Sequence, residues 1–146
     1  MKKIVHFHPN GNYAKKFVKP LKDNEIKSGF HSLLVTETKS KKNDINMPFT
    51  LFCSPWKILF RIVNLIKFFH IKKPYIVISH NSITSFLPLL TSRLCFVRNI
   101  IYFNHGVPFV GYSGFLYFLL KFIEIMNCIL AKNIYTVSFD MKHILS

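Results

Sequence analysis

The chain has 146 residues, of which 50% are hydrophobic and 16% aromatic, so it is long and apolar enough to bury the core of one domain. This composition excludes an intrinsically disordered chain. The formal net charge of +14 favours anionic partners such as acidic lipid headgroups, phosphorylated small molecules or nucleic acid, although a genomic bias towards Lys, Asn, Ile and Phe explains the charge equally well.

Short β-like runs alternate with helical runs along the chain, which predicts an α/β fold with a parallel sheet flanked by helices. Strands are expected at Ile4–His8, Phe30–Glu37, Met47–Cys53, Tyr75–Ser79, Asn99–Phe103 and Ile134–Val137. Helices are expected at Tyr13–Lys27, Pro55–Lys73, Ile83–Cys95 and Gly114–Ala131. A polar, basic stretch at Thr38–Asp44 is expected to be a solvated loop.

The first two predicted helices carry apolar side chains at helical spacing. In the first helix these are Tyr13, Phe17 and Leu21, and Pro20 interrupts the pattern. The second helix begins at Ser54 and Pro55, residues that favour a helix start. Its apolar row is Trp56, Leu59, Phe60, Val63, Ile66 and either Phe69 or His70. Its basic residues, including Lys57 and Arg61, fall on another face.

Polar residues follow four of the predicted strands, at the edge where ligands of open α/β sheets bind. The candidate site residues there are Asn10, Gly11, His80, Asn104, His105, Gly106 and Ser138. Three of the four strand ends carry a histidine, in a chain with 7 histidines, which favours a functional site over four unrelated loops. Backbone N–H groups at Asn10 and Gly11 would begin a helix, and helix N-termini favour a phosphate.

Several other kinds of site are disfavoured by the pattern. The turn after the first strand has one glycine, Gly11, where a dinucleotide-binding motif needs three, so NAD and FAD are not expected. No carboxylate accompanies the strand-end histidines, and no metal or other cofactor is expected. His6 would lie in mid-strand and is expected to be packed. The aromatic residues do not alternate with basic ones, which argues against a nucleic-acid interface.

The sequence also predicts a location in the cell. Cys53, Cys95 and Cys128 form no CxxC pair and are expected to be small buried hydrophobes of a reducing compartment. No signal peptide begins the chain. The apolar stretch Phe115–Ala131 is shorter than the roughly 20 residues that a bilayer span needs. We therefore expect a cytoplasmic protein.

The segments KIVHFHPNG, YIVISHNS, IIYFNHGVPF and FIEIMNCILAKNIYTVSFDMKHIL, in this order and spacing, resemble the N-terminal half of family 4 glycosyltransferases. These retaining enzymes have the GT-B architecture, in which two Rossmann-like domains face each other across a cleft. The resemblance implies that residues 1–146 are the acceptor-side domain and that the C-terminal donor-binding domain is absent. It implies a nucleotide-sugar donor, a glycan or lipid-linked acceptor in lipopolysaccharide or capsule assembly, and no activity of the chain alone.

The resemblance also assigns roles to residues. It implies that His105 hydrogen-bonds the donor sugar and stabilises charge in the transition state, and that His80 lines the cleft. Asn10 and Gly11 stand where the family usually has paired glycines near the donor diphosphate. Glu124 matches a helical glutamate of the family, and Ser138 matches the serine that ends its next strand.

Members of this family often dock on anionic membranes, and the second predicted helix suits such a surface. Trp56 and Phe60, with Lys57 and Arg61, would form an interfacial helix. An ordinary helix packed on the sheet explains these residues equally well. A further alternative is a non-enzymatic remnant, or a binding subunit that pairs with a separate donor-binding chain.

Overall fold

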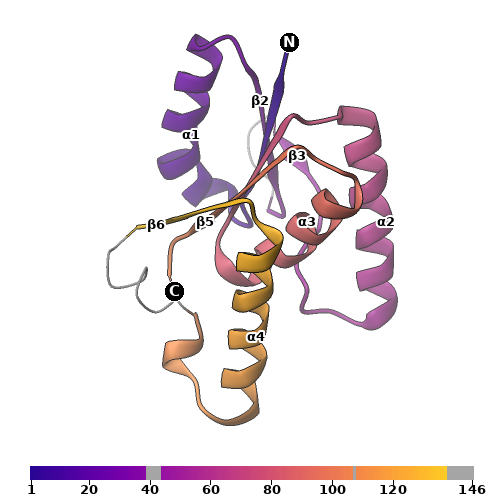
Figure 1. Cartoon of the computed structure of the whole chain (residues 1–146), viewed down its shortest axis with the longest axis vertical. Coiled ribbons are helices and arrows are strands. Elements are labelled where there is room, and N and C mark those ends of the chain that lie inside the picture. The colour runs from indigo at the N-terminus through magenta and orange to yellow at the C-terminus, as the bar shows by residue number, and fades with distance from the viewer. Residues whose placement is uncertain (39–43, 107, 138–146) are drawn as a thin grey trace.

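The computed structural model describes residues 1–38, 44–106 and 108–137 (Figure 1). Within them, six parallel strands form one sheet in the order β3-β2-β1-β4-β5-β6. The strands are β1 Lys3–Phe7, β2 His31–Thr36, β3 Ile45–Asn46, β4 Ile76–His80, β5 Asn99–Asn104 and β6 Asn133–Thr136. The helices are α1 Gly11–Lys27, α2 Pro55–Lys72, α3 Ser82–Leu94 and α4 Gly114–Leu130, with a 3-10 turn, η1, at Pro108–Gly111.

The strand order reverses beside β1, because the chain runs outward from β1 to β3 and then returns to build β4 to β6 on the other side. His6 of β1 lies level with Leu34 of β2 and with Ile78 of β4. This is the strand order of the Rossmann-like fold, in which the point of reversal opens a crevice beyond the carboxyl ends of the strands. The predicted fold class is therefore confirmed.

Helices cover both faces of the sheet, with α1 on one side and α2 and α3 on the other (Figure 1). The larger core lies under α2 and α3, where Phe7 of β1 makes edge-to-face contacts with Phe49, Phe68 and Phe69. Such contacts add to the free energy gained by apolar burial. A second cluster joins Ile100 and Tyr102 of β5 to α3 and to the end of α4.

The apolar row predicted for the first helix does not face the sheet. Tyr13 and Phe17 are 60% and 52% exposed, and the residues that α1 buries against Leu34 of β2 are Ala14 and Val18. These small side chains allow the helix axis to approach the sheet closely, whereas the aromatic rings are left at the rim. Pro20 does not interrupt α1, which is continuous from Gly11 to Lys27.

The expected third strand at Met47–Cys53 is wrong, since β3 is the two-residue strand Ile45–Asn46. The carboxylate of Glu37 explains the difference. Its Oε1 accepts hydrogen bonds from the backbone N–H groups of Phe49 (2.6 Å) and Thr50 (2.5 Å). These amides are held by a side chain, and Phe49 enters the core from a loop rather than from a strand.

The cysteines and the second helix are more exposed than the sequence predicted. Cys53, Cys95 and Cys128 are free thiols, but each is partly exposed rather than buried. The second helix buries Leu65, Phe68 and Phe69, so that much of its predicted apolar row faces solvent. Ser138 and positions 39–43 of the predicted loop lie outside the described residues.

Candidate functional site

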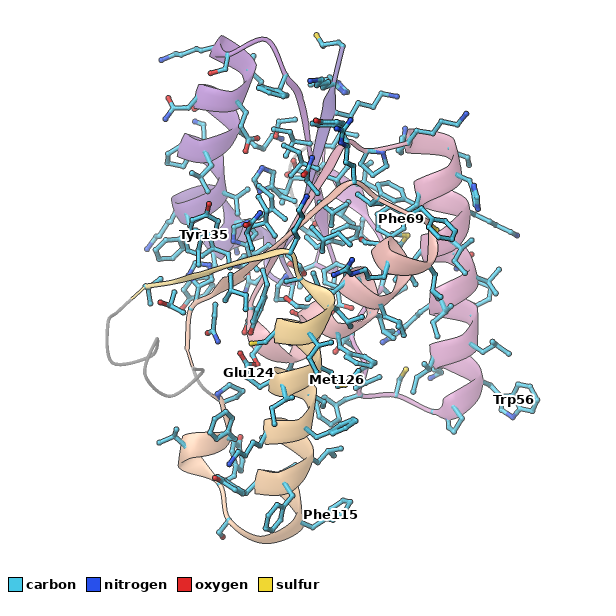
Figure 2. The ribbon with its side chains drawn as sticks, viewed as in Figure 1. Trp56, Phe69, Phe115, Glu124, Met126 and Tyr135 are labelled. Carbon is cyan, nitrogen blue, oxygen red and sulfur yellow. The ribbon has the colours of Figure 1, made fainter. Side chains whose placement is uncertain are left out.

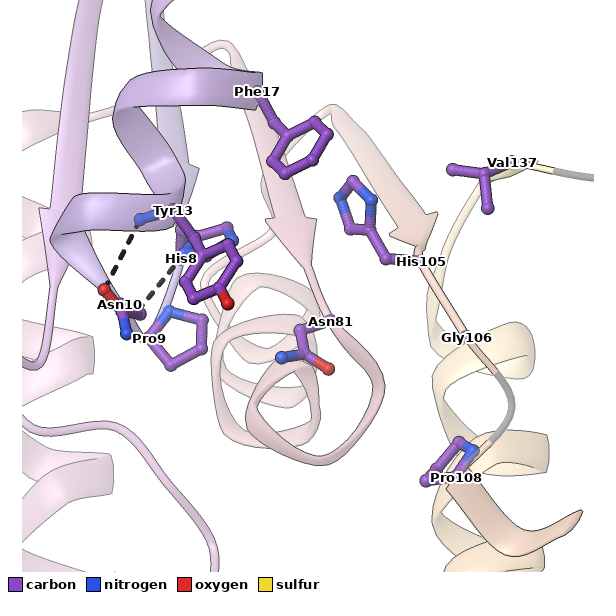
Figure 3. Close-up of a pocket in the computed structure, with 10 residues that line it drawn as sticks. All are labelled: His8, Pro9, Asn10, Tyr13, Phe17, Asn81, His105, Gly106, Pro108 and Val137. Carbon is purple, nitrogen blue, oxygen red and sulfur yellow. Dashed lines mark hydrogen bonds between the residues drawn. The ribbon is translucent and has the colours of Figure 1, made fainter. Parts of the chain in front are cut away.

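A cavity of about 770 Å³ opens beyond the carboxyl ends of β1, β4 and β5, at the point where the strand order reverses (Figure 3). Its wall comes from the loops after these strands, the first turns of α1, and η1. The lining residues are His8, Pro9, Asn10, Tyr13, Phe17, Asn81, His105, Gly106, Pro108 and Val137. Three of the predicted site residues, Asn10, His105 and Gly106, therefore meet in one cavity.

The remaining predicted residues that the structure describes lie behind this wall. His80 and Asn104 are 1% and 0% exposed, and neither lines the cavity. Gly11 is likewise buried at the start of α1. These residues support the cavity from behind. His8 and Asn81, which the sequence places at strand ends, also line the cavity, as do Tyr13 and Phe17, which the sequence had not linked to the site.

The start of α1 is capped by the chain's own side chains. The Oδ1 atom of Asn10 accepts hydrogen bonds from the N–H groups of Asn12 (2.9 Å) and Tyr13 (3.4 Å), and Thr38 Oγ1 accepts one from Gly11 (3.0 Å). An N-cap of this kind satisfies the amides that a phosphate would otherwise bind. A phosphate at Gly11 would have to displace these partners.

His8 presents a hydrogen-bond donor to the cavity. Its Nδ1 atom accepts a hydrogen bond from the backbone N–H of Asn10 (3.2 Å), and burial lowers the pKa of its imidazole below the ordinary value. A neutral imidazole whose Nδ1 accepts carries its proton on Nε2. The Nε2–H group of His8 is thus available to a ligand oxygen.

Asn81 lines the cavity in a strained backbone conformation. Its φ of 78° and ψ of 145° fall in a region that residues with a side chain seldom adopt. The Oδ1 atom of Asn81 accepts a hydrogen bond from the N–H of Ser82 (2.9 Å) and so caps α3. Strain of this kind is typical of functional loops.

A row of hydrogen-bonded groups runs from the cavity into the sheet. His105 Nε2 lies 3.2 Å from His80 Nδ1, and His80 Nε2 lies 3.1 Å from His6 Nδ1. His6 Nε2 in turn lies 2.9 Å from Oε2 of Glu25 on α1. His6 is fully buried, as predicted from its position in the strand.

Burial sets the protonation of this row. It lowers the pKa of His105 and holds that of His80 well below the ordinary value, so both rings are neutral at pH 7. Burial of Glu25 acts to raise its pKa, but the interactions with His6, followed by those with Ser32 and Lys22, together outweigh burial and lower the pKa overall. The row therefore runs from the Glu25 carboxylate to two neutral imidazoles, those of His80 and His105.

Glu124 of α4 is the centre of a second buried cluster, and it is only 1% exposed. Its carboxylate accepts hydrogen bonds from the hydroxyl groups of Ser82 and Tyr102 (2.8 Å for the latter) and from Nδ2 of Asn104 (2.5 Å). Oδ1 of Asn104 accepts the N–H of Gly106 (2.7 Å). Glu124 thereby fixes the loop that carries His105.

The histidine rings hydrogen-bond to one another rather than pointing at a common centre. Among the described residues, no group of three or more His, Cys, Asp or Glu side chains is arranged to hold a metal ion. Imidazole and carboxylate groups in hydrogen-bond contact, as in this row, are suited to proton transfer.

The membrane-facing candidates lie on α2, away from the cavity. Trp56 is 81% exposed and projects from the start of the helix (Figure 2), and Phe60 and Lys57 are also exposed. Arg61 instead donates a hydrogen bond to the backbone oxygen of Thr50. Over the part of the chain that the structure describes, every helix is too short or too polar to cross a bilayer.

No protein-family model and no curated protein matches the sequence. Solved structures do match it. A putative UDP-N-acetylglucosamine 2-epimerase from Listeria monocytogenes has a TM-score of 0.74 at 17% identity, over 99% of this chain and 42% of the epimerase. The UDP-GlcNAc 2-epimerase from Neisseria meningitidis, bound to UDP-GlcNAc, has a TM-score of 0.69 at 17% identity, over 99% of this chain and 42% of the epimerase. MurG from Acinetobacter baumannii has a TM-score of 0.61 at 13% identity, over 94% of this chain and 42% of MurG.

These similarities show the fold, a Rossmann-like α/β domain shared with GT-B-type proteins. The chain spans less than half the length of the structures it matches. The matched proteins are epimerases and MurG, so assignment to family 4 of the glycosyltransferases stays a prediction from the sequence.

Proposed function

We propose that this chain is the N-terminal, acceptor-side domain of a GT-B-type enzyme that uses a nucleotide sugar. Within that class we propose a family 4 glycosyltransferase, which transfers a sugar to a glycan or lipid-linked acceptor in bacterial surface polysaccharide assembly. The fold of solved nucleotide-sugar enzymes over 94–99% of the chain supports the broader proposal. The sequence resemblance described above supports the narrower one.

The cavity at the reversal of the strand order is the observation on which the proposal rests. It offers the N–H group of His8 and the imidazole of His105 to ligand oxygens, between the rings of Tyr13 and Phe17. Polar groups in a largely apolar wall suit a sugar, which has hydroxyl groups at its edges and apolar C–H faces. In this proposal His105 contacts the reacting sugar, and Gly106 leaves space beside it.

Complete turnover would need a donor-binding half, because the matched enzymes are more than twice as long as this chain. We expect no sugar transfer by residues 1–146 alone when a labelled sugar nucleotide is supplied. A donor-binding half would come from further sequence of the same protein or from a separate chain that pairs with this one, which is the binding-subunit alternative. Transfer by the purified chain alone would contradict this expectation.

Ligand binding tests the broader proposal directly. Chemical-shift changes in a ¹⁵N-labelled chain, titrated with UDP-GlcNAc, UDP and N-acetylglucosamine at millimolar concentrations, are expected at His8, Tyr13 and His105. Phe17→Ala removes a cavity wall and should weaken binding several-fold, whereas Phe118→Ala, an exposed phenylalanine on α4, should leave it unchanged. Shift changes confined to other surfaces would refute the proposed site.

A second candidate is an epimerase acting on the sugar of a nucleotide sugar. Five of the solved structures described as UDP-N-acetylglucosamine 2-epimerases or MnaA match with TM-scores of 0.69 to 0.75, above the 0.61 of MurG. Co-expression with the product of the neighbouring reading frame, followed by incubation with UDP-GlcNAc, separates the two. An epimerase forms the C2 epimer without an acceptor, whereas a transferase releases UDP only when an acceptor is present.

We also propose that the protein is cytoplasmic and docks on the inner face of the cytoplasmic membrane through α2. The exposed aromatic rings of Trp56 and Phe60 beside Lys57, in a chain of net charge +14, support this proposal. Flotation with vesicles containing anionic lipid should carry the wild-type chain and lose the double variant W56A/F60A. Equal flotation of both proteins would remove the role of α2.

A further inference from the structure

The row Glu25, His6, His80 and His105 joins the partly exposed surface of α1 to the cavity through three consecutive hydrogen bonds. Each imidazole uses one ring nitrogen towards one neighbour and the other nitrogen towards the next. His105 is the exception, because its Nδ1 atom has no hydrogen-bond partner among the described residues while the ring lines the cavity (Figure 3). The row therefore has one end at a carboxylate and one end open to a ligand.

The carboxylate orders the protons of the whole row. Glu25 can only accept, so His6 must donate from Nε2, and a neutral His6 then has an unprotonated Nδ1. That atom accepts from Nε2–H of His80, whose own Nδ1 must accept from Nε2–H of His105. Consequently Nδ1 of His105, on a ring that lines the cavity, carries a lone pair without a hydrogen-bond partner among the described residues.

We propose that these four residues form a proton relay, in which His105 Nδ1 accepts the proton of a ligand hydroxyl and the resulting positive charge moves to His6, beside Glu25. This inference rests on the proposed function, because it names the chemistry of that cavity towards an acceptor hydroxyl. His105 is the group that contacts the ligand. Glu25, His6 and His80 are positioning residues that act through it.

The transfer balances without any other reactant. The ligand O–H bond breaks as N–H forms at His105 Nδ1, and His105 gives its Nε2 proton to His80 Nδ1. His80 then gives its Nε2 proton to His6 Nδ1. His6 now holds protons on both nitrogens and forms an ion pair with the Glu25 carboxylate at 2.9 Å, while the ligand oxygen keeps the electron pair of the broken bond.

Other charged groups near the row limit how the charge is placed. Lys22 on the same helix lies close enough to Glu25 to lower its pKa, and it also pairs with Asp44 at 3.8 Å. His8, the residue directly after β1, lies beside both His80 and His105, with ring centroids 5.9 and 6.5 Å away. A positive charge on His6 faces the Glu25 carboxylate, whereas no carboxylate of the described residues is hydrogen-bonded to His105, so the charge is more stable at the Glu25 end.

Nitrogen NMR of the imidazole rings tests the relay without a ligand. Long-range ¹H–¹⁵N spectra of the ¹⁵N-labelled chain distinguish the two neutral tautomers, and a pH titration gives the proton affinity of each ring. We expect the Nε2–H tautomer at His6, His80 and His105 in the wild type. In Glu25→Gln the side-chain amide can accept or donate, so mixed tautomers should appear and the proton affinity of His105 should fall by about tenfold.

A control removes the same charge from the same helix. Asp23 is exposed on α1, and Asp23→Asn should leave the titration of His105 unchanged. The signals of the exposed rings of His31 and His70 serve as internal references and should be the same in every variant. His6→Gln cuts the row at a second point and should reproduce the effect of Glu25→Gln. Dispersed backbone spectra establish that each variant is folded.

Two results would overturn the relay: an Nδ1–H tautomer of His105 in the wild type, or a His105 titration that is the same in Glu25→Gln and Asp23→Asn. Because no sugar nucleotide is present, these results concern the relay alone. The ligand titration described above reports separately on the proposed function, so either proposal can fail while the other stands.

Discussion

Two glutamates, Glu25 and Glu124, bind residues that lie behind the cavity, and their surroundings differ in exposure and in the type of partner. Glu25 on α1 is partly exposed, with 17% of its side chain accessible, and it meets an imidazole. Glu124 on α4 is 1% exposed and meets two hydroxyl groups and one amide. The partner of Glu25 is an imidazole, which can hold a proton on each ring nitrogen, whereas the hydroxyl and amide partners of Glu124 do not act as bases.

The pKa values of the two carboxyl groups differ accordingly. Burial raises the pKa of Glu124, and its three hydrogen bonds do not fully offset this effect. For Glu25, burial is outweighed by His6 and the pKa is lowered. One side of the cavity is thus suited to proton transfer, and the other is a fixed anchor for the loop that carries His105.

The largest expected effect is on the anchor. Glu124→Ala leaves the hydroxyl groups of Ser82 and Tyr102 and the amide of Asn104 buried without their acceptor, which should lower the free energy of unfolding by about 3 kcal/mol or more. Urea denaturation followed by circular dichroism measures this change in the free energy of unfolding. Lys121→Ala, on an exposed position of the same helix, should change stability by less than about 0.5 kcal/mol. A loss below 1 kcal/mol for Glu124→Ala would refute the anchor.

The next effect is a pH dependence of stability that has opposite signs at the two glutamates. The raised pKa of Glu124 means that the folded state holds its proton above pH 4.5, where the unfolded state has lost it. The stability of the wild type relative to Glu124→Gln should therefore fall as pH rises above 4.5, through the folded pKa.

Glu25 should show the reverse trend. Its lowered pKa stabilises the folded protein above pH 4.5, and this contribution is lost as pH falls through the folded pKa. The wild type should thus gain stability relative to Glu25→Gln as pH rises. Denaturation curves of the wild type, Glu25→Gln and Glu124→Gln between pH 3 and 8 measure both trends. Trends of the same sign for the two variants would contradict the opposite pKa shifts of the two glutamates.

A smaller effect is expected from Tyr102→Phe. This change removes one of the donors to Glu124 while keeping the ring in the core, and should cost about 1 kcal/mol. Tyr135→Phe, on the exposed strand β6, is the matched control and should be neutral in the same denaturation assay. If both variants unfold at the same urea concentration, Tyr102 does not contribute to holding the carboxylate.

Much of this fold is readable from the sequence because local patterns determine it. The alternation of β-like and helical runs predicted, for the described residues, five of the six strands and the four helices to within a residue or two. The parallel order of the strands follows from the helices that connect them. β3 was misplaced because Glu37 holds the amides of Phe49 and Thr50. A carboxylate 12 and 13 residues away leaves no local pattern.

The candidate site was only half visible for the same reason. His105 and Asn10 were found because they follow strands, and strand ends meet at one edge. The link from His6 to Glu25 depends on how α1 sits on the sheet, which the helical pattern predicted wrongly by favouring Tyr13 and Phe17. A glutamate in the last turns of the helix after an HxH strand is a weak signal for such a contact.

The smallest effect distinguishes the two possible sources of the lowered pKa of Glu25. Lys22 contributes less than His6, because it is partly exposed and already paired with Asp44 at 3.8 Å. Lys22→Ala should change stability by less than about 0.5 kcal/mol and leave the pH trend of Glu25 in place. His6→Gln should weaken that trend more, because it removes the imidazole that makes the largest contributions to lowering the pKa of Glu25. Loss of the trend in Lys22→Ala would mean that a surface cation, not the buried imidazole, governs Glu25, and the contrast with Glu124 would then reduce to a difference in exposure.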